Sequence, residues 1–392
     1  MEKTNNLTDF LTDVANAIRE KEGSSEAINP QDFVAKIRSI AGLPGVDKVT
    51  HNELDAFLLD LANTLREAHG TSEPINPQAF SAQILSIVPV ITDMKLLPLF
   101  VEAIEPLTVS FSANPIEYSL DNRTWQTLPV GASTPTIGAG MRVYFRASGL
   151  TATSADGIGT FSTTGMFNVG GNIMSMSYGA DFQYKTEITN NYAFSRLFRY
   201  AEGMVDASNL QLPAMSLTEY CYNVMFAYCI NLIIGPNLPA LNLPAFCYSG
   251  MYTACSNLNS VCALPATILG QQCYDGMYKE CVSLEVAQEE LPAETISQQS
   301  YGNMYRDCKN LKKSPIIRAK HIALYGFNRM FRGCSNLRHV TCYAESKATS
   351  GSTTSEWLYG VAGSGTIVKS RKLSLPSGYN GIPGGWTVEF LD

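Results

Sequence analysis

The stretch Tyr222-Asn223-Val224-Met225-Phe226-Ala227-Tyr228-Cys229-Ile230-Asn231-Leu232 decides the fold, because its pattern returns along the C-terminal half of the chain. The pattern is Tyr or Phe, then Met three residues later, an aromatic residue directly after the Met, Cys at seven and Leu at ten. Its copies start at Tyr222, Tyr248, Tyr274, Tyr301 and Phe327, which lie 26 or 27 residues apart. A repeat of this period indicates stacked units that share one core.

Each copy of the pattern predicts a short helix followed by an extended segment. Residues at i, i+3, i+4 and i+7 lie on one face of a two-turn helix. The Leu that follows starts the extended part, and Leu-Pro-Ala ends it, as at 238–240. A unit of this size cannot bury its apolar face alone, so the units must stack. The predicted core consists of Met225, Cys229, Met251, Cys255, Met277, Cys281, Met304, Cys308, Met330 and Cys334.

Eight of the ten cysteines follow the same period, in two sets: Cys229, Cys255, Cys281, Cys308 and Cys334, and Cys221, Cys247 and Cys273. Equivalent thiols in stacked units would lie about 5 Å apart, which is within the range of a disulfide. Buried, reduced packing residues are the favoured interpretation, because Cys is small and often fully buried. A metal site is disfavoured, since no C-x-x-C occurs and the four His are scattered.

The N-terminal quarter is a separate acidic module with an internal duplication. Residues 15–40 and 62–87 align without a gap at an offset of 47. Each copy predicts two short helices, the second starting at Asn29-Pro30 or Asn76-Pro77, which suit an N-cap and a first helical position. Residues 1–92 hold 13 acidic and 7 basic residues, whereas the other 300 hold 22 and 21. We expect an attachment module here; the alternative is a plain helical domain with no docking role.

Residues 93–180 change to the pattern of a β domain. Ile116, Tyr118 and Leu120 alternate with polar neighbours, and 143–147 reads as a second strand. Short strands separated by Asn, Asp and Gly turns predict an antiparallel, sandwich-like domain. We interpret it as a spacer without chemistry of its own.

The repeated phrase resembles the leucine-rich repeat of the BspA-like type, found in surface proteins of Bacteroides-like gut bacteria and in their phages. The likeness extends to 171–179 before the repeats and to 360–366 and 381–388 after them. The duplicated hairpin resembles a module of phage virion and tail-associated proteins. With these resemblances the expected fold class is multidomain α + β. It comprises a helical-hairpin pair (1–92), a β-sandwich-like domain (93–180), a leucine-rich-repeat solenoid (181–345) and a C-terminal β cap (346–392).

Composition excludes some functions. The net charge of −7 argues against an overall basic, nucleic-acid-binding protein. No apolar run approaches the about 20 residues that cross a bilayer, so no membrane insertion is expected. The first 20 residues lack the continuous apolar core of a secretory signal, so we expect synthesis in the host cytoplasm and localisation to the virion.

No catalytic signature accompanies the repeats. H-E-x-x-H, a Walker loop and G-x-S-x-G are absent from the sequence, so we expect no enzyme activity, cofactor or metal. A glycan depolymerase remains an alternative, because its two carboxylates need form no local motif. The basic stretch from Lys309 to Lys320 is interpreted as a solvated face, with contact to an acidic surface as the alternative.

These features predict a non-enzymatic phage virion protein, a head or tail fibre or decoration. Residues 1–92 would bind other virion proteins, and the repeats would adhere to a host surface glycan or protein. A homo-oligomer is expected, a trimer among the options. The alternative is a bacterial BspA-like surface adhesin. Candidate contact residues are Tyr343, Trp357, Tyr359 and Tyr379, which capping of the repeat stack would explain equally well.

Overall fold

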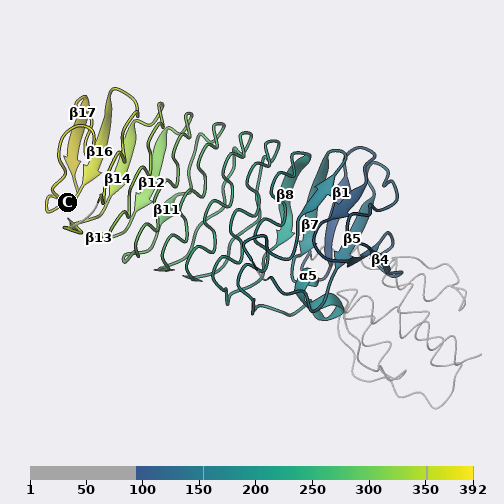
Figure 1. The fold of residues 1–392 in the computed structure, drawn as a ribbon. Helices are drawn as coiled ribbons and strands as arrows, with labels where there is room; N and C mark the ends of the chain where they lie inside the picture. The colour runs from purple at the N-terminus through teal and green to yellow at the C-terminus, as the bar shows by residue number, and fades with distance from the viewer. Residues whose placement is uncertain (1–93, 153, 350–351, 392) are drawn as a thin grey trace, which may run out of the picture. The chain divides into compact units, whose positions relative to one another are not determined.

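The computed structural model describes residues 94–392, apart from 153, 350, 351 and 392. The chain divides into two units, residues 1–96 and 97–392. The predicted helical hairpins, with Asn29, Pro30, Asn76 and Pro77, lie outside the described residues. The second unit is a sheet that leads into a long row of coils (Figure 1).

The second unit begins with a six-stranded sheet in the order β4-β3-β5-β1-β7-β8. Its strands are β1 (Leu99–Ala103), β3 (Ile116–Ser119), β4 (Gln126–Leu128), β5 (Arg142–Arg146), β7 (Phe167–Asn172) and β8 (Met204–Gln211). A separate antiparallel pair consists of β2 (Val109–Phe111) and β6 (Phe161–Thr163). Side chains of β5 alternate between the two faces of the sheet, and those of Val143 and Phe145 are buried. The rings of Phe145 and Phe161 lie 4.9 Å apart, so the sheet and the pair share a core.

The direction of strand pairing changes at the last pair of this sheet. The pairs up to β7 are antiparallel, whereas β7 and β8 are parallel. Between them lie α5 (Ser175–Tyr178), which ends at Gly179 with a φ of 58°, and the 3-10 turn η3 (Gly179–Asp181). α5 is the one α-helix among the described residues, and no helix there could span a membrane. The sheet therefore continues directly into the coils.

Each coil contains short strands that pair in parallel with the next coil. They are β9 (Asn242–Leu243), β10 (Ile268–Leu269), β11 (Glu290–Leu291), β12 (Lys313–Ile317), β13 (His321–Ile322), β14 (His339–Cys342), β15 (Ser346–Lys347), β16 (Gly365–Lys369) and β17 (Trp386–Phe390). The longest parallel sheet has the order β11-β12-β14-β16-β17. Lys313 of β12 pairs with His339 of β14, and the two residues are one repeat apart in the sequence. One turn of the chain thus corresponds to one copy of the sequence pattern.

The segment predicted as a helix in each repeat is a ribbon of successive turns. In residues 219–228, the N–H groups of Asn223 and Met225 each donate to the carbonyl three residues earlier. The alternate N–H groups leave the coil, as when Tyr222 donates to Cys247 O at 3.0 Å. Every fourth residue has a positive φ, including Tyr220 (59°) and Tyr228 (66°). The backbone donors are therefore shared between the turn and the next coil.

The predicted fold class, multidomain α + β with a leucine-rich-repeat solenoid, is wrong for the described residues, which are nearly all strand and turn. Each expected two-turn helix is a turn ribbon. The sequence pattern fits either structure, because a helix and a turn ribbon both bring residues at i, i+3, i+4 and i+7 to one side. An α-helix needs a negative φ throughout, which the positive φ at every fourth position rules out. Within 93–180 the strand pairs are antiparallel, and the sheet becomes mixed only through the parallel pair of β7 with β8, which lies beyond that range.

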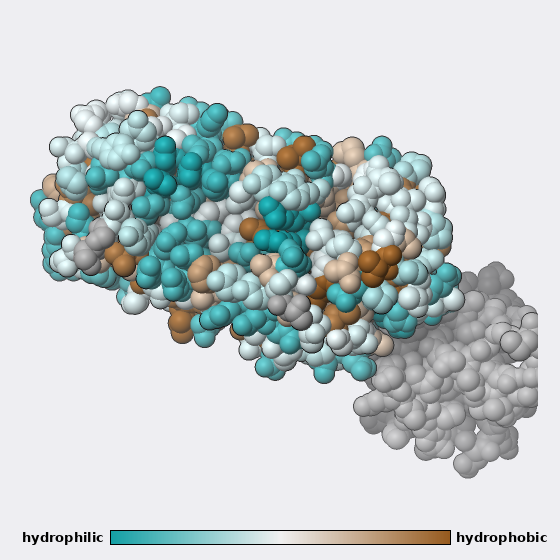
Figure 2. Space-filling model, viewed as in Figure 1, coloured by the Kyte–Doolittle hydropathy of each residue, from teal (hydrophilic) through white to brown (hydrophobic). Residues whose placement is uncertain are grey.

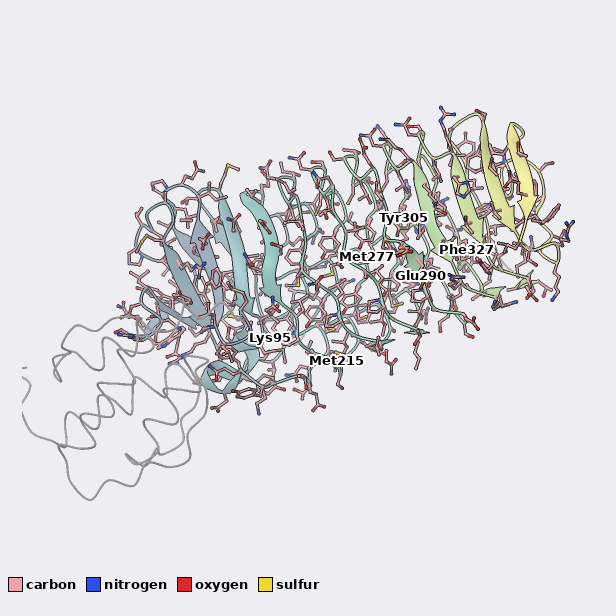
Figure 3. The ribbon with its side chains drawn as sticks, turned by 180° about the vertical axis from the view of Figure 1, so that it is seen from behind. Lys95, Met215, Met277, Glu290, Tyr305 and Phe327 are labelled. Atoms are coloured by element: carbon pink, nitrogen blue, oxygen red, sulfur yellow. The ribbon has the colours of Figure 1, made fainter. Side chains whose placement is uncertain are left out.

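Stacked side chains fill the interior of the coils. Met225, Cys229, Met251, Cys255, Met277, Cys281, Met304, Cys308, Met330 and Cys334 are all 0% exposed. One aromatic column runs through Phe161, Phe198, Phe226, Tyr252, Tyr278, Tyr305 and Phe331, with centroids 5.4–5.7 Å apart. A second runs through Phe194, Tyr222, Tyr248, Tyr274, Tyr301, Phe327 and Trp357, at 5.6–6.3 Å. Figure 3 labels Met277, Tyr305 and Phe327 in this interior.

Candidate functional surface

Nine of the ten cysteines are buried, and five of their thiols donate hydrogen bonds to backbone carbonyls of the preceding coil. The thiol of Cys229 donates to the carbonyl of Phe198 in the preceding coil at 3.0 Å, and Cys308 donates to Tyr278 O at 2.9 Å. All ten are free thiols. Burial raises the pKa of Cys255 to about 12 and that of the half-buried Cys262 to about 11. Thiols with such pKa values are almost wholly protonated at neutral pH and are poor nucleophiles.

Four of the buried tyrosines differ in whether the hydroxyl has a hydrogen-bond partner. Tyr305 donates its hydroxyl to Gln288 Oε1 at 2.6 Å. The hydroxyls of Tyr222, Tyr252 and Tyr278 are buried without a hydrogen-bond partner. Desolvation raises the pKa of the Tyr252 and Tyr278 hydroxyls well above the ordinary value, so they stay neutral. These groups pack in the core and face no site where a substrate could reach them.

Among the described residues, several ionisable side chains form ion pairs between neighbouring coils. Lys312 pairs with Glu285 at 2.5 Å, Arg318 with Glu290 at 2.9 Å and Lys372 with Glu345 at 2.8 Å. Each of these pairs joins one coil to its neighbour. Within the part of the chain that the structure describes, no three His, Cys, Asp or Glu gather as a metal-ligand set.

The structure buries one predicted contact residue. Trp357 is 0% exposed, and its ring stacks on Phe327 with centroids 5.8 Å apart. Its indole N–H donates to Gly381 O at 2.9 Å. The prediction of Trp357 as a surface contact is wrong, because its ring continues the second aromatic column instead. Nothing in the local sequence distinguishes it from the exposed Tyr359 two residues later.

Tyr359 and Tyr379 form an exposed pair near the C-terminal end of the coils. They are 48% and 54% exposed, and their ring centroids lie 4.9 Å apart. Glu356 lies beside them, 3.0 Å from Arg329 and 2.8 Å from Arg332. Burial raises the pKa of Glu356, but hydrogen bonds from Arg329 and Tyr379 and the charges of both arginines outweigh it, so the net pKa is lowered. The carboxylate is thus used to hold the coils together.

Tyr343 is covered by cations of the preceding coil. The guanidinium of Arg318 lies 4.8 Å from its ring centroid, and the Lys320 ammonium lies 5.6 Å from it. The residue is half-buried. The cations of the preceding coil therefore occupy a face of its ring.

The early coils carry a different set of outward aromatic residues, at positive-φ positions of the turn ribbon. Tyr192, Tyr220 and Phe246 stack with centroids 4.6 and 4.4 Å apart. Tyr200 and Tyr228 stack at 4.7 Å. Because each ring covers the face of its neighbour, the row presents ring edges to solvent. Sequence reasoning missed these positions, since they follow the turn geometry and not the core pattern.

The late coils, residues 309–372, carry basic residues at neighbouring positions of successive coils. We call Lys309, Lys312, Lys313, Arg338 and His339 the basic face. Arg338 N donates to Lys312 O at 3.1 Å, and Lys313 is the register partner of His339. The sequence shows the first three together, but Arg338 and His339 join them only through the offset of 26 residues. Figure 2 shows hydrophilic side chains gathered over the region of β11, β12 and β14.

Fold and surface together define a protein of stacked parallel coils with a closed core and variable outward positions. No family model matches the chain, and comparison with curated proteins and with solved structures also yields no match.

Proposed function

We propose that the chain is a non-enzymatic structural protein of a phage virion, a fibre or decoration that presents its coils to a bacterial surface. Residues 1–92 would dock on other virion proteins. The observation that carries the proposal is the contrast between the regular interior columns and the changing outward side chains of the same coils. Such a stack is a stiff scaffold whose surface can be altered without altering its core.

The placement of polar groups supports a binding role over catalysis. Catalysis needs a nucleophile, an acid or a base that reaches a shared point with substrate access. Here five of the thiols donate to backbone carbonyls, and Glu356 is held by Arg329 and Arg332. These groups stabilise contacts between coils.

The exposed aromatic and cationic side chains support adhesion. Tyr359 and Tyr379 offer large contact area at low cost in side-chain entropy. In this proposal they and Tyr343 contact the host surface. Assignment to a virion rests on the resemblance of the duplicated N-terminal hairpin to phage virion modules.

Mass spectrometry of purified virions tests the placement. The expected result is that peptides from 1–92 and from the coils are both present at the level of a structural protein. Peptides found in the bacterial envelope and missing from virions would contradict the proposal and favour a surface adhesin.

Adsorption to Bacteroides-type cells tests the binding role. The full chain should bind the cells and should block adsorption of the particles. Incubation with capsular polysaccharide should leave the length of its chains unchanged; shortened chains would instead indicate a depolymerase.

A further inference from the structure

The late coils differ in charge from the rest of the described chain. Residues 309–372 contain twelve Lys and Arg and two carboxylates, a net of +10. Residues 94–308 contain nine basic and seventeen acidic residues, a net of −8. A region of one sign within a chain of the opposite net charge creates a local potential that attracts anions.

The cations of the basic face are held close together by the backbone. Lys309, Lys312, Lys313 and Arg338 are exposed, and His339 is half-buried. Asn336 N donates to Lys309 O at 3.1 Å, so the corner of one coil lies directly on the corner of the next. Adjacent strands are about 4.8 Å apart, which places charges of neighbouring coils within a Debye length of each other.

Few carboxylates neutralise this face. Glu285 pairs with Lys312, but both side chains are more than half exposed, and such pairs are weak. Burial and then the charge of Lys313 lower the pKa of His339, and the charge of Glu389 opposes this shift, so the positive charge of the face comes from its lysines and Arg338. No carboxylate of the described residues lies within ion-pair distance of Lys309, Lys313 or Arg338.

Neutral hydrogen-bonding groups alternate with the cations. The amides of Asn310 and Asn336 join at 3.2 Å along the same corner. Arg338 donates to Ser364 Oγ at 3.3 Å, and Thr366 is the register partner of His339. Cations that alternate with amides and hydroxyls match a polymer that carries both carboxylates and hydroxyl groups.

A single-stranded nucleic acid fits this face less well. Binding of that kind uses free aromatic faces on which bases stack. Tyr343, four residues after His339, has its ring covered by Arg318 and Lys320. The negative remainder of the described chain also opposes a long polymer with a charge at every residue.

We propose that the basic face binds acidic polysaccharide, a glycan of the host surface with carboxylates spaced along the chain. This inference rests on the adhesion role above and names its ligand class. Lys309, Lys313 and Arg338 would neutralise carboxylates, and the Asn310–Asn336 row would bind sugar hydroxyls.

The test uses the full chain on surfaces coated with alginate, hyaluronate or neutral dextran, measured by biolayer interferometry. The variant is K309Q/K313Q/R338Q. The matched control is K95Q/R123Q/K185Q, which removes the same charge from outside the late coils. We expect binding to at least one acidic polymer and none to dextran. The variant should bind about tenfold or more weakly, the control should not, and salt should weaken binding.

Adsorption to cells is measured in parallel, so that this inference can fail separately. Cell binding without binding to either acidic polymer, or equal binding by variant and control, would overturn the ligand class and leave adhesion standing. Loss of cell binding by every form of the protein would contradict the proposed function itself. Tighter binding to oligonucleotides than to the acidic polymers would identify the face as a nucleic-acid site and overturn the inference.

Discussion

The early and the late coils share one backbone and one interior but differ in surface charge. Residues 204–274 contain two carboxylates, Asp206 and Glu219, and no Lys or Arg. Residues 309–372 contain twelve basic residues. Both regions keep the turn ribbon, the Met and Cys positions and the aromatic columns. The inward residues therefore determine the coil, and the outward residues are free to specify what it contacts.

The largest expected effect tests whether the two interiors are equivalent. Met277→Ala before the basic region and Met330→Ala within it each remove a fully buried side chain. Each should lower the free energy of unfolding by about 3 kcal/mol. Chemical denaturation measures both. Losses that differ by more than about half of that value would show that the coils do not share equivalent cores.

An intermediate effect separates buried tyrosines with and without a hydrogen-bond partner. Tyr305→Phe removes the partner of Gln288 and leaves a buried amide oxygen unpaired, so it should cost about 1–2 kcal/mol. Tyr278→Phe removes an unpartnered hydroxyl from the same column and should be neutral or stabilising. Denaturation of both variants provides the comparison. A larger loss for Tyr278→Phe would contradict the assignment of hydrogen bonds.

A smaller effect concerns acidic pH, which should destabilise the late coils before the early coils. Ion pairs lower the pKa of Glu345 and Glu356 in the folded state, so their stabilisation is present above the ordinary value of 4.5 and is lost as pH falls through the lowered values. Burial and then the charge of Lys313 also lower the pKa of His339 in the folded state. Protonation of this side chain at acidic pH therefore destabilises the folded state as well. Hydrogen exchange, with rates corrected for pH, should show protection falling first in 309–372.

Two checks accompany the acid experiment. Glu356→Gln should reduce the difference between acidic and neutral pH, because the variant has no carboxylate to protonate there. Earlier loss of protection in 204–274 would be the opposite of what the ion pairs predict.

The smallest effect concerns the reactivity of the cysteine thiols. At pH 8 a thiol reagent should modify Cys262 first and slowly, because it is the one half-buried cysteine and its pKa is about 11. The other nine should react only after unfolding. Mass spectrometry of labelled peptides identifies the sites, and rapid labelling of Cys229 or Cys281 in the native protein would show that the core is open.

Much of the interior could be predicted because inward positions recur at equal spacing. Met251 and Cys255 return with the period, and burial of one copy implies burial of the others. The helix prediction was wrong because eight residues are too few to distinguish a four-residue turn period from a helical turn. Trp357 was misplaced because it has no Met and Cys after it, so the pattern that marks the column is missing there.

The amino-acid sequence alone determined the period, the set of inward side chains and the charge of each coil, because these are properties of spacing and composition. Only the tertiary structure decided how the backbone closes each repeat, since the alternate N–H groups donate to carbonyls 25 to 27 residues away. It also decided the surface, because Lys313 and His339 become neighbours only when successive coils lie in register. Hydrogen bonding between distant segments is a property of the folded stack, and no local pattern specifies it.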